Sequence, residues 1–242
     1  MTIRGTKLGG TFLRRYLSRG YTCATGLWLV VGCTPRLGSI APHGYVPADR
    51  MVVQGWIGGM TPSRPRQYEI RPWRFRNEAG SAAGRAVIRI VPPDSMRFDY
   101  RGPFGKSGSV ALVGDSALWM TSDDLQGLVT YGPLFWTALG IPLAPPDTVA
   151  LFSLVGDGFR AWRYILAQDT LDFVLQGSPA KRLLGEIRRQ GQVLAQARVE
   201  LDTLTGLALE ARIDFYDVSR FEFTVQSVDT LVSFDETIWR LQ

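Results

Sequence analysis

Apolar and polar residues alternate with a period of two along most of the chain after residue 66, and this pattern constrains the fold most. Successive side chains of a strand point to opposite faces, so the alternation predicts strands with one buried face. The predicted strands are Gln67–Arg76, Gly84–Val91, Met96–Arg101, Ser107–Val113, Ala117–Met120, Ala161–Ala167, Asp169–Leu175, Arg182–Gln190, Gln192–Leu201, Leu207–Phe215, Arg220–Val228 and Thr237–Leu241. Short turns join them, as expected of an antiparallel sheet.

These strands predict a single domain over residues 66–242 that is mainly β, of the α+β class. A sheet with so many strands curls, because neighbouring strands twist relative to one another. We therefore expect a curled antiparallel sheet that forms a half-open β-barrel.

The strand pattern is interrupted at about residues 123–157 by a segment with helical character. Helices are predicted at Asp123–Leu128, Pro133–Leu139 and Pro146–Val155. The stretch 131–155 is very apolar, but its five Pro and Asp interruptions disfavour a membrane span. We expect a short helical lid, hinged at prolines, over an apolar interior.

The charge of the chain lies in its first 32 residues, which are predicted to be a lipoprotein signal peptide. The chain has 27 Lys and Arg against 22 Asp and Glu, and five of the basic residues but no acidic one lie within residues 1–32. The remainder is formally neutral, which disfavours nucleic acid as a partner. Eleven apolar residues follow the basic region and end in Val30–Cys33, a sequence that resembles the bacterial lipobox.

Lipidation of Cys33 would fix the protein to a membrane without a transmembrane helix. Thr34 follows the cysteine, where Asp would retain a lipoprotein at the inner membrane, so we expect the periplasmic face of the outer membrane. The pair Arg14–Arg15 leaves twin-arginine export open beside the general route. Residues 33–65 are predicted to be a lipid-anchored tether rich in Pro and Gly, with a short helix at Asp49–Ile57.

The sequence offers little for catalysis, and we expect a protein that is no enzyme and has no metal or cofactor. Ser116 follows Gly-Asp as in some lipid esterases, but it lies between two predicted strands and no His follows it. The single His, His43, belongs to the tether. The acidic pairs Asp123–Asp124 and Asp235–Glu236 are expected to be solvated helix or strand ends.

One apolar residue is expected to be hard to bury. Phe104 occupies the tip of the turn Gly102–Gly105 beside Lys106, and exposed apolar tips often touch a membrane or partner. Local packing of the ring is the alternative. The order of elements around this turn resembles the outer-membrane lipoprotein receptor LolB and its LolA-like relatives. A strand leads into the turn, and two further strands, a helix, Gly140–Leu143 and Pro146–Gly158 follow it.

The resemblance implies a half-barrel whose apolar cavity takes the acyl chains of lipoproteins or other lipids, with a periplasmic LolA-like carrier as a partner. It implies that the turn Pro103, Phe104 and Gly105 contacts the membrane, with Phe in place of the family's Leu. The implied cavity and lid residues are Leu134, Phe135, Leu139, Ile141, Leu151 and Phe152. The expected function is to bind acylated proteins and help insert them in the outer membrane.

Two other functions stay open. One is an envelope assembly or sensing lipoprotein with the same fold but a filled core and no carrier activity. The other is a lipid hydrolase that uses Ser116, which the absence of a following His disfavours. An open apolar cavity of several hundred Å³ would favour the carrier, and a closed interior would favour the assembly factor.

Overall fold

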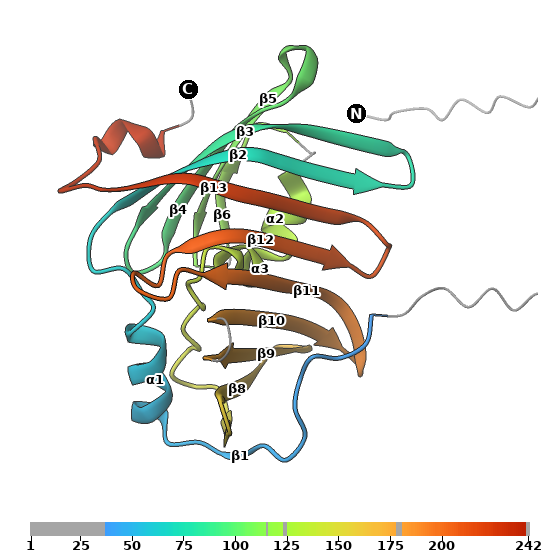
Figure 1. The fold of residues 1–242 in the computed structure, drawn as a ribbon, viewed down its shortest axis with the longest axis vertical. Coiled ribbons are helices and arrows are strands. Elements are labelled where there is room, and N and C mark those ends of the chain that lie inside the picture. Colours follow the sequence, from blue (N-terminus) through green and yellow to red (C-terminus); the bar gives the residue numbers. More distant parts are fainter. Residues whose placement is uncertain (1–36, 115, 123–124, 178–180, 241–242) are drawn as a thin grey trace, which may run out of the picture. The chain divides into compact units, whose positions relative to one another are not determined.

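The computed structural model describes residues 37–114, 116–122, 125–177 and 181–240. Within them, thirteen strands form one antiparallel sheet in the order β1-β7-β8-β9-β10-β11-β12-β13-β2-β3-β4-β5-β6 (Figure 1). The two end strands do not pair with each other, so the sheet is curled but not closed, and the prediction of a half-open barrel is confirmed.

The strands agree closely with the alternating segments of the sequence. Their bounds are β1 Val46–Pro47, β2 Arg66–Asn77, β3 Gly80–Val91, β4 Ser95–Arg101, β5 Ser107–Val113, β6 Ser116–Met120, β7 Leu151–Gly156, β8 Phe159–Leu166, β9 Asp169–Gln176, β10 Arg182–Arg189, β11 Gln192–Leu201, β12 Ala208–Phe215 and β13 Arg220–Thr230. In β11, for example, every second residue from Val193 to Leu201 is buried. The alternation of apolar and polar residues thus identifies the side chains on the concave face of the sheet.

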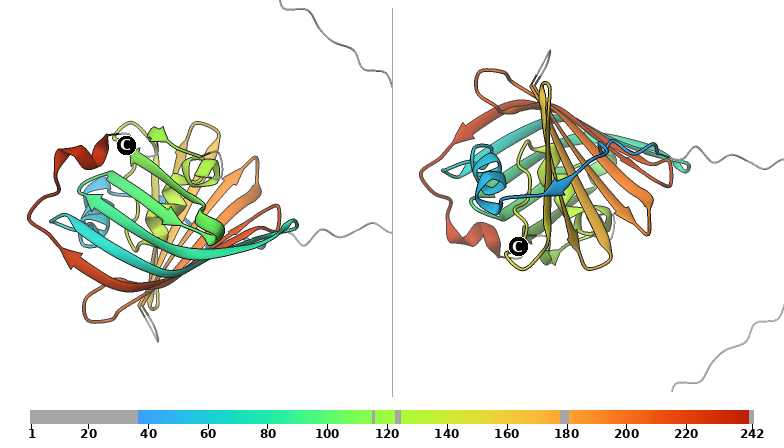
Figure 2. Two further views of the ribbon diagram at one scale, coloured as in Figure 1. Left: turned by 90° about the horizontal axis from the view of Figure 1, so that it is seen from above. Right: turned by 90° about the horizontal axis from the view of Figure 1, so that it is seen from below.

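Two short helices between β6 and β7 lie in the trough of the sheet (Figure 2). They are α2, Gln126–Thr130, and α3, Gly132–Ala138, which confirms the helix predicted at Pro133–Leu139. All residues of α3 are buried, and the helix packs on β10, β11 and β12. Gly185 of β10 permits this approach, because a Cβ there would lie 2.9 Å from the Thr137 hydroxyl and 3.0 Å from the Leu134 side chain.

The third predicted helix, Pro146–Val155, is wrong. Residues 146–150 form a turn and irregular chain, and Leu151–Gly156 is strand β7, paired with β8. The predicted lid therefore ends before Leu151. The Gly156-Asp157-Gly158 turn explains the difference, because Gly158 at φ 73° closes a hairpin that pairs Val155 with Arg160.

The last predicted strand, Thr237–Leu241, is also wrong where the structure describes it. Glu236–Trp239 is a 3₁₀ helix, and Asp235 caps it by accepting a hydrogen bond from the Thr237 amide. Backbone carbonyls of this helix accept bonds from Arg97 of β4 and from the Trp119 indole of β6. These side-chain hydrogen bonds hold the segment in place of the backbone hydrogen bonds that a strand would make to a neighbouring strand.

Before β2, the helix α1, Arg50–Gly58, confirms the helix predicted at Asp49–Ile57. Asp49 is its N-cap and accepts a hydrogen bond from the Met51 amide, while Val53 and Ile57 are buried in the main core. No described helix is long and apolar enough to cross a membrane.

The tether predicted before α1 is ordered where the structure describes it. Residues 38–47, which we call the strap, cross the convex face of the sheet and end in β1, whose Val46 and Pro47 pair with β7. The pattern of Pro and Gly correctly disfavours a helix here but does not reveal this docking.

Candidate functional site

An apolar pocket of about 790 Å³ opens on the concave side of the sheet. It lies at the sheet edge that carries the turns 78–79, 102–106, 190–191 and 216–219, which we call the mouth edge. Nine of the lining residues are aromatic: Trp73, Phe75, Phe98, Tyr100, Phe104, Tyr131, Phe215, Tyr216 and Phe221. This volume and character are typical of sites for small apolar ligands.

One wall of the pocket is built by aromatic rings that stand over glycines. The rings of Trp73 and Tyr100 meet edge to face with centroids 5.7 Å apart. A Cβ at Gly108 would lie 2.5 Å from the Tyr100 ring, and one at Gly84 would lie 2.9 Å from the Trp73 ring and 2.0 Å from the Arg101 carbonyl. The two glycines therefore make room for the wall.

Phe135 of α3 supports the pocket from behind. The centroid of its ring lies 5.5 Å from that of the Phe98 ring and 5.6 Å from that of the Phe221 ring. Both Phe98 and Phe221 line the pocket. Helix α3 thus fills the deep part of the trough and leaves the space nearest the mouth edge open.

Residues 125–131, on and beside α2, form a second side of the pocket. Leu125, Leu128 and Tyr131 line it, and the Tyr131 ring lies 5.1 Å from that of Phe215. Burial, with Asp217 nearby, raises the pKa of Tyr131 above its ordinary value, so the phenol stays neutral. The wall is therefore uncharged at this point.

The rim of the pocket carries exposed apolar residues on two turns. Phe104 is fully exposed (102%), and Tyr216 and Val218 are more than half exposed. Phe104 and Val218 both have positive φ, 56° and 68°, a costly conformation for residues with a Cβ. Polar groups at the rim are Lys106, which lines the pocket, and Asp217, which accepts bonds from Ser219.

The structure separates the predicted site residues into three groups. Pro103 and Phe104 line the pocket, and Gly105, at φ 77°, completes their turn. Leu134, Phe135, Leu139, Ile141 and Leu151 are buried in the main core and are not among the lining residues. Phe152 of β7 pairs with Arg163 on the convex face, beside β1. Cys33 lies outside the described residues.

The sequence analysis missed most of the pocket. Trp73, Phe98, Tyr100 and Phe221 alternate within strands and are read as core, which leaves no sign that an open space faces them. Tyr216 and Val218 could have been predicted from the sequence. They are bulky apolar residues on either side of Asp217 in a turn between strands, and Phe104 is likewise a bulky apolar residue in a turn.

The residues considered for catalysis that the structure describes are not among the pocket-lining residues. Ser116 begins β6 in the hairpin predicted for it, and His43 is an exposed residue of the strap. Asp235 caps the 3₁₀ helix, and Asp123–Asp124 lie outside the described residues. The described lining residues include neither His nor Cys.

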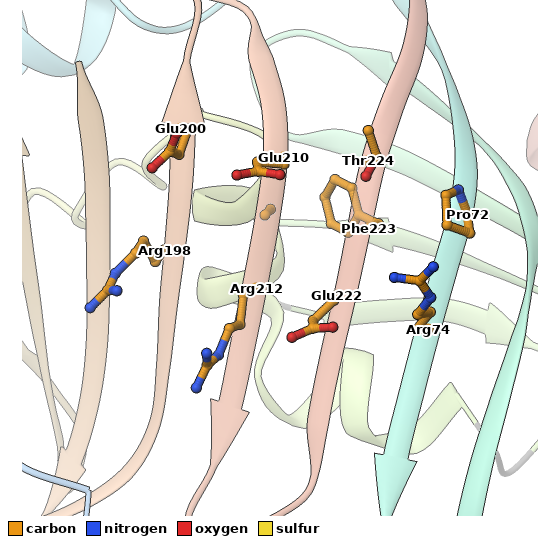
Figure 3. Close-up of a pocket in the computed structure, with 10 residues that line it drawn as sticks. Pro72, Arg74, Arg198, Glu200, Glu210, Arg212, Glu222, Phe223 and Thr224 are labelled. Atoms are coloured by element: carbon orange, nitrogen blue, oxygen red, sulfur yellow. The ribbon is translucent and has the colours of Figure 1, made fainter. Parts of the chain in front are cut away.

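A second hollow, of about 350 Å³, lies on the convex face over β11, β12, β13 and β2 (Figure 3). Its side chains are mostly charged, and like charges face each other across strands, Arg198 opposite Arg212 and Glu200 opposite Glu210. Such pairs destabilise a sheet slightly. The mixed charge suits a polar surface and not an acyl chain.

Comparison with known proteins defines the class of fold. No protein-family model and no curated protein matches the sequence. A LolA superfamily protein from Nitrosomonas europaea matches in structure with a TM-score of 0.54 at 8% identity, and the match covers 80% of this chain and 98% of that one. The chain therefore has a LolA/LolB-like fold, as the sequence resemblance predicts.

A further solved structure matches more weakly. A putative outer membrane lipoprotein-sorting protein domain from Vibrio parahaemolyticus matches with a TM-score of 0.45 at 9% identity, over 78% of this chain and 95% of that one. At such identities the likeness concerns the fold alone.

Proposed function

We propose that this protein is a lipid-anchored protein of the bacterial outer membrane that binds acyl chains in the mouth pocket and passes them to the bilayer. The observation that carries the proposal is the open pocket of about 790 Å³ with nine aromatic residues in its lining. Transferring an acyl chain from water to such a wall gains about 0.8 kcal/mol for each buried CH₂. Acylated lipoproteins are the proposed cargo, and a LolA-like carrier is the proposed donor.

Binding, and not catalysis, is the proposed activity. The polar groups that line the pocket are few, and Asp217 and Ser219 are already bonded to each other. A pocket of this kind holds an apolar ligand without a set of groups that could activate a nucleophile. The signal peptide and the lipidated Cys33 remain part of the proposal.

The binding step predicts a clear effect of filling the pocket. Ala82 of β3 lines the pocket, so Ala82→Trp should occupy its space and weaken binding of a fatty acid at least about tenfold, or 1.4 kcal/mol. The measurement is a fluorescence titration with a fatty acid labelled at its chain end, using protein exported behind an ordinary signal peptide.

Ala83→Trp is the matched control, because Ala83 is exposed and its side chain points to the other face of β3, opposite Arg74. It should bind as the parent does. Equal binding by the parent and Ala82→Trp would show that the fatty acid does not bind in this pocket.

The assembly or sensing role is the second candidate, and the full burial of α3 favours it. Leu134, Phe135 and Trp136 fill the deep trough, so the fold is stable without a ligand there. If the parent binds no fatty acid or acylated peptide at all, this role replaces the carrier role.

A further inference from the structure

The charged groups of the mouth pocket lie at its opening. Most of the lining is aromatic or aliphatic, and among the described lining residues Lys106 and Asp217 are the two with a charged side chain. Both are exposed, Lys106 in the turn 102–106 and Asp217 in the turn 216–219. An acyl chain gains most by filling the apolar interior, so its polar head should stay beside these two charges.

Asp217 is engaged within its own turn. Its Oδ1 atom accepts hydrogen bonds from the Ser219 amide at 3.0 Å and from the Ser219 hydroxyl at 2.5 Å. Ser219 is itself buried, so these bonds belong to the packing of the turn. The carboxylate therefore has a partner before any ligand binds.

Lys106 has a fixed backbone and a free ammonium group. Two backbone hydrogen bonds close its turn, from the Gly102 amide to the Lys106 carbonyl at 2.8 Å and from the Lys106 amide to the Pro103 carbonyl at 3.2 Å. Among the residues that the structure describes, none forms an ion pair or a hydrogen bond with the Lys106 ammonium. The turn thus holds an unpaired cation at the opening of an apolar pocket.

Two neighbouring arginines keep this side of the opening positive. Arg101 of β4 lies directly opposite Arg85 of β3, and both are exposed. Within the described part of the chain, neither guanidinium has an acidic partner. Like charges in this position destabilise a sheet slightly, and their field at the turn favours a negatively charged head over a neutral or positive one.

We propose that the mouth pocket selects acyl ligands with an anionic head, a carboxylate or a phosphate, and that Lys106 determines this specificity by binding the head. An ammonium group donates short, charge-assisted hydrogen bonds to such oxygens. The proposal rests on the proposed binding of an acyl chain in the pocket and goes beyond it in naming the head group. Fatty acids and anionic phospholipids share this chemistry.

Decanoate and decanol, which have acyl chains of equal length and differ in the head, test the proposal. Each is titrated into the exported, unlipidated protein, and isothermal calorimetry gives its dissociation constant. Lys106→Gln should weaken decanoate binding at least about threefold, as expected for the loss of one partly screened charge pair, and leave decanol binding unchanged. The residues that carry the proposal all lie after residue 66, so the exported protein contains them.

Two control variants separate the charge of Lys106 from other effects. Lys106→Arg keeps the positive charge and should keep most of the affinity for decanoate. Lys181→Gln removes the same charge at the opposite edge, where the Lys181 carbonyl accepts a hydrogen bond from the Leu201 amide beside the turn 202–207, and should have no effect.

Salt gives a second measure of the charge interaction. Raising the salt concentration from about 0.1 M to about 1 M shortens the Debye length from about 10 Å to about 3 Å. The affinity of the parent for decanoate relative to decanol should then fall toward the value for Lys106→Gln, and the value for the variant should change little.

Equal losses of decanoate and decanol binding in Lys106→Gln would overturn the proposal, because the lysine would then act through its packing and not its charge. Unchanged binding of both ligands would also overturn it, but would leave the proposed carrier function intact. If the parent binds neither ligand, the proposed function fails and this proposal fails with it, so the two failures can be told apart.

Lysophosphatidylglycerol with the same acyl chain distinguishes the two sources of an anionic head. If Lys106→Gln weakens its binding as it weakens that of decanoate, the ligands include anionic phospholipids. If the loss is confined to decanoate, the ligands are free fatty acids.

Discussion

Phe104→Glu is expected to slow the transfer of a bound acyl chain into vesicles at least about tenfold. Phe104 is fully exposed at the tip of its turn, and moving such a ring from water into lipid gains about 1.5–3 kcal/mol. A carboxylate gains nothing and adds a cost of its own, so the membrane contact that we propose to precede release should be lost. The measurement is the rate at which protein loaded with a fluorescent fatty acid delivers it to the vesicles.

Two variants make this result specific. Phe104→Leu keeps an apolar tip, as in the LolB family, and should keep most of the rate. Leu204→Glu introduces the same charge at an equally exposed site on the opposite edge and should have no effect. If Leu204→Glu slows transfer as much as Phe104→Glu, the effect is general charge repulsion and Phe104 has no special part.

Most of the fold could be predicted because it depends on a local pattern. Alternation in β2 to β13 records which face of each strand is buried, and short turns fix antiparallel neighbours. The failures were at β7 and at Glu236–Trp239, where the pattern is weak. There, the glycine turn directly after β7 and two side chains from β4 and β6 decide the structure.

The site could be predicted only at its tip. Phe104 is visible in the sequence because its turn is defined by neighbouring Pro and Gly residues. The pocket itself depends on how far α3 enters the trough, which the contacts of Thr137 and Leu134 with Gly185 set. No spacing in the sequence encodes that distance, so five of the six residues predicted to line a cavity instead fill the core behind it, and Phe152 lies on the convex face.

Asp172→Ala is expected to destabilise the protein by about 3–5 kcal/mol, because it leaves Arg163 without its carboxylate and leaves Arg188 with Glu186 alone. The Asp172 side chain is 0% exposed, and its 2.6 Å pairs with Arg163 and Arg188 join β8, β9 and β10 under the strap, where the guanidinium of Arg163 lies 4.2 Å from the centre of the Tyr45 ring. For a chain of this size, such a loss lowers the melting temperature by about 6–20 °C. Thermal and urea unfolding of the exported, unlipidated protein measure it.

Asp214→Ala provides the matched control in the same sheet. Asp214 also pairs with two arginines, Arg212 and Arg220, but its side chain is 23% exposed and no strap covers it. Solvent screens these pairs, so its loss should cost about 1 kcal/mol. Equal losses for the two variants would mean that the strap does not bury Asp172 in solution. A much larger loss of stability for Asp172→Ala would show that the strap unfolds together with the sheet, because the docked strap keeps the Asp172 carboxylate from water.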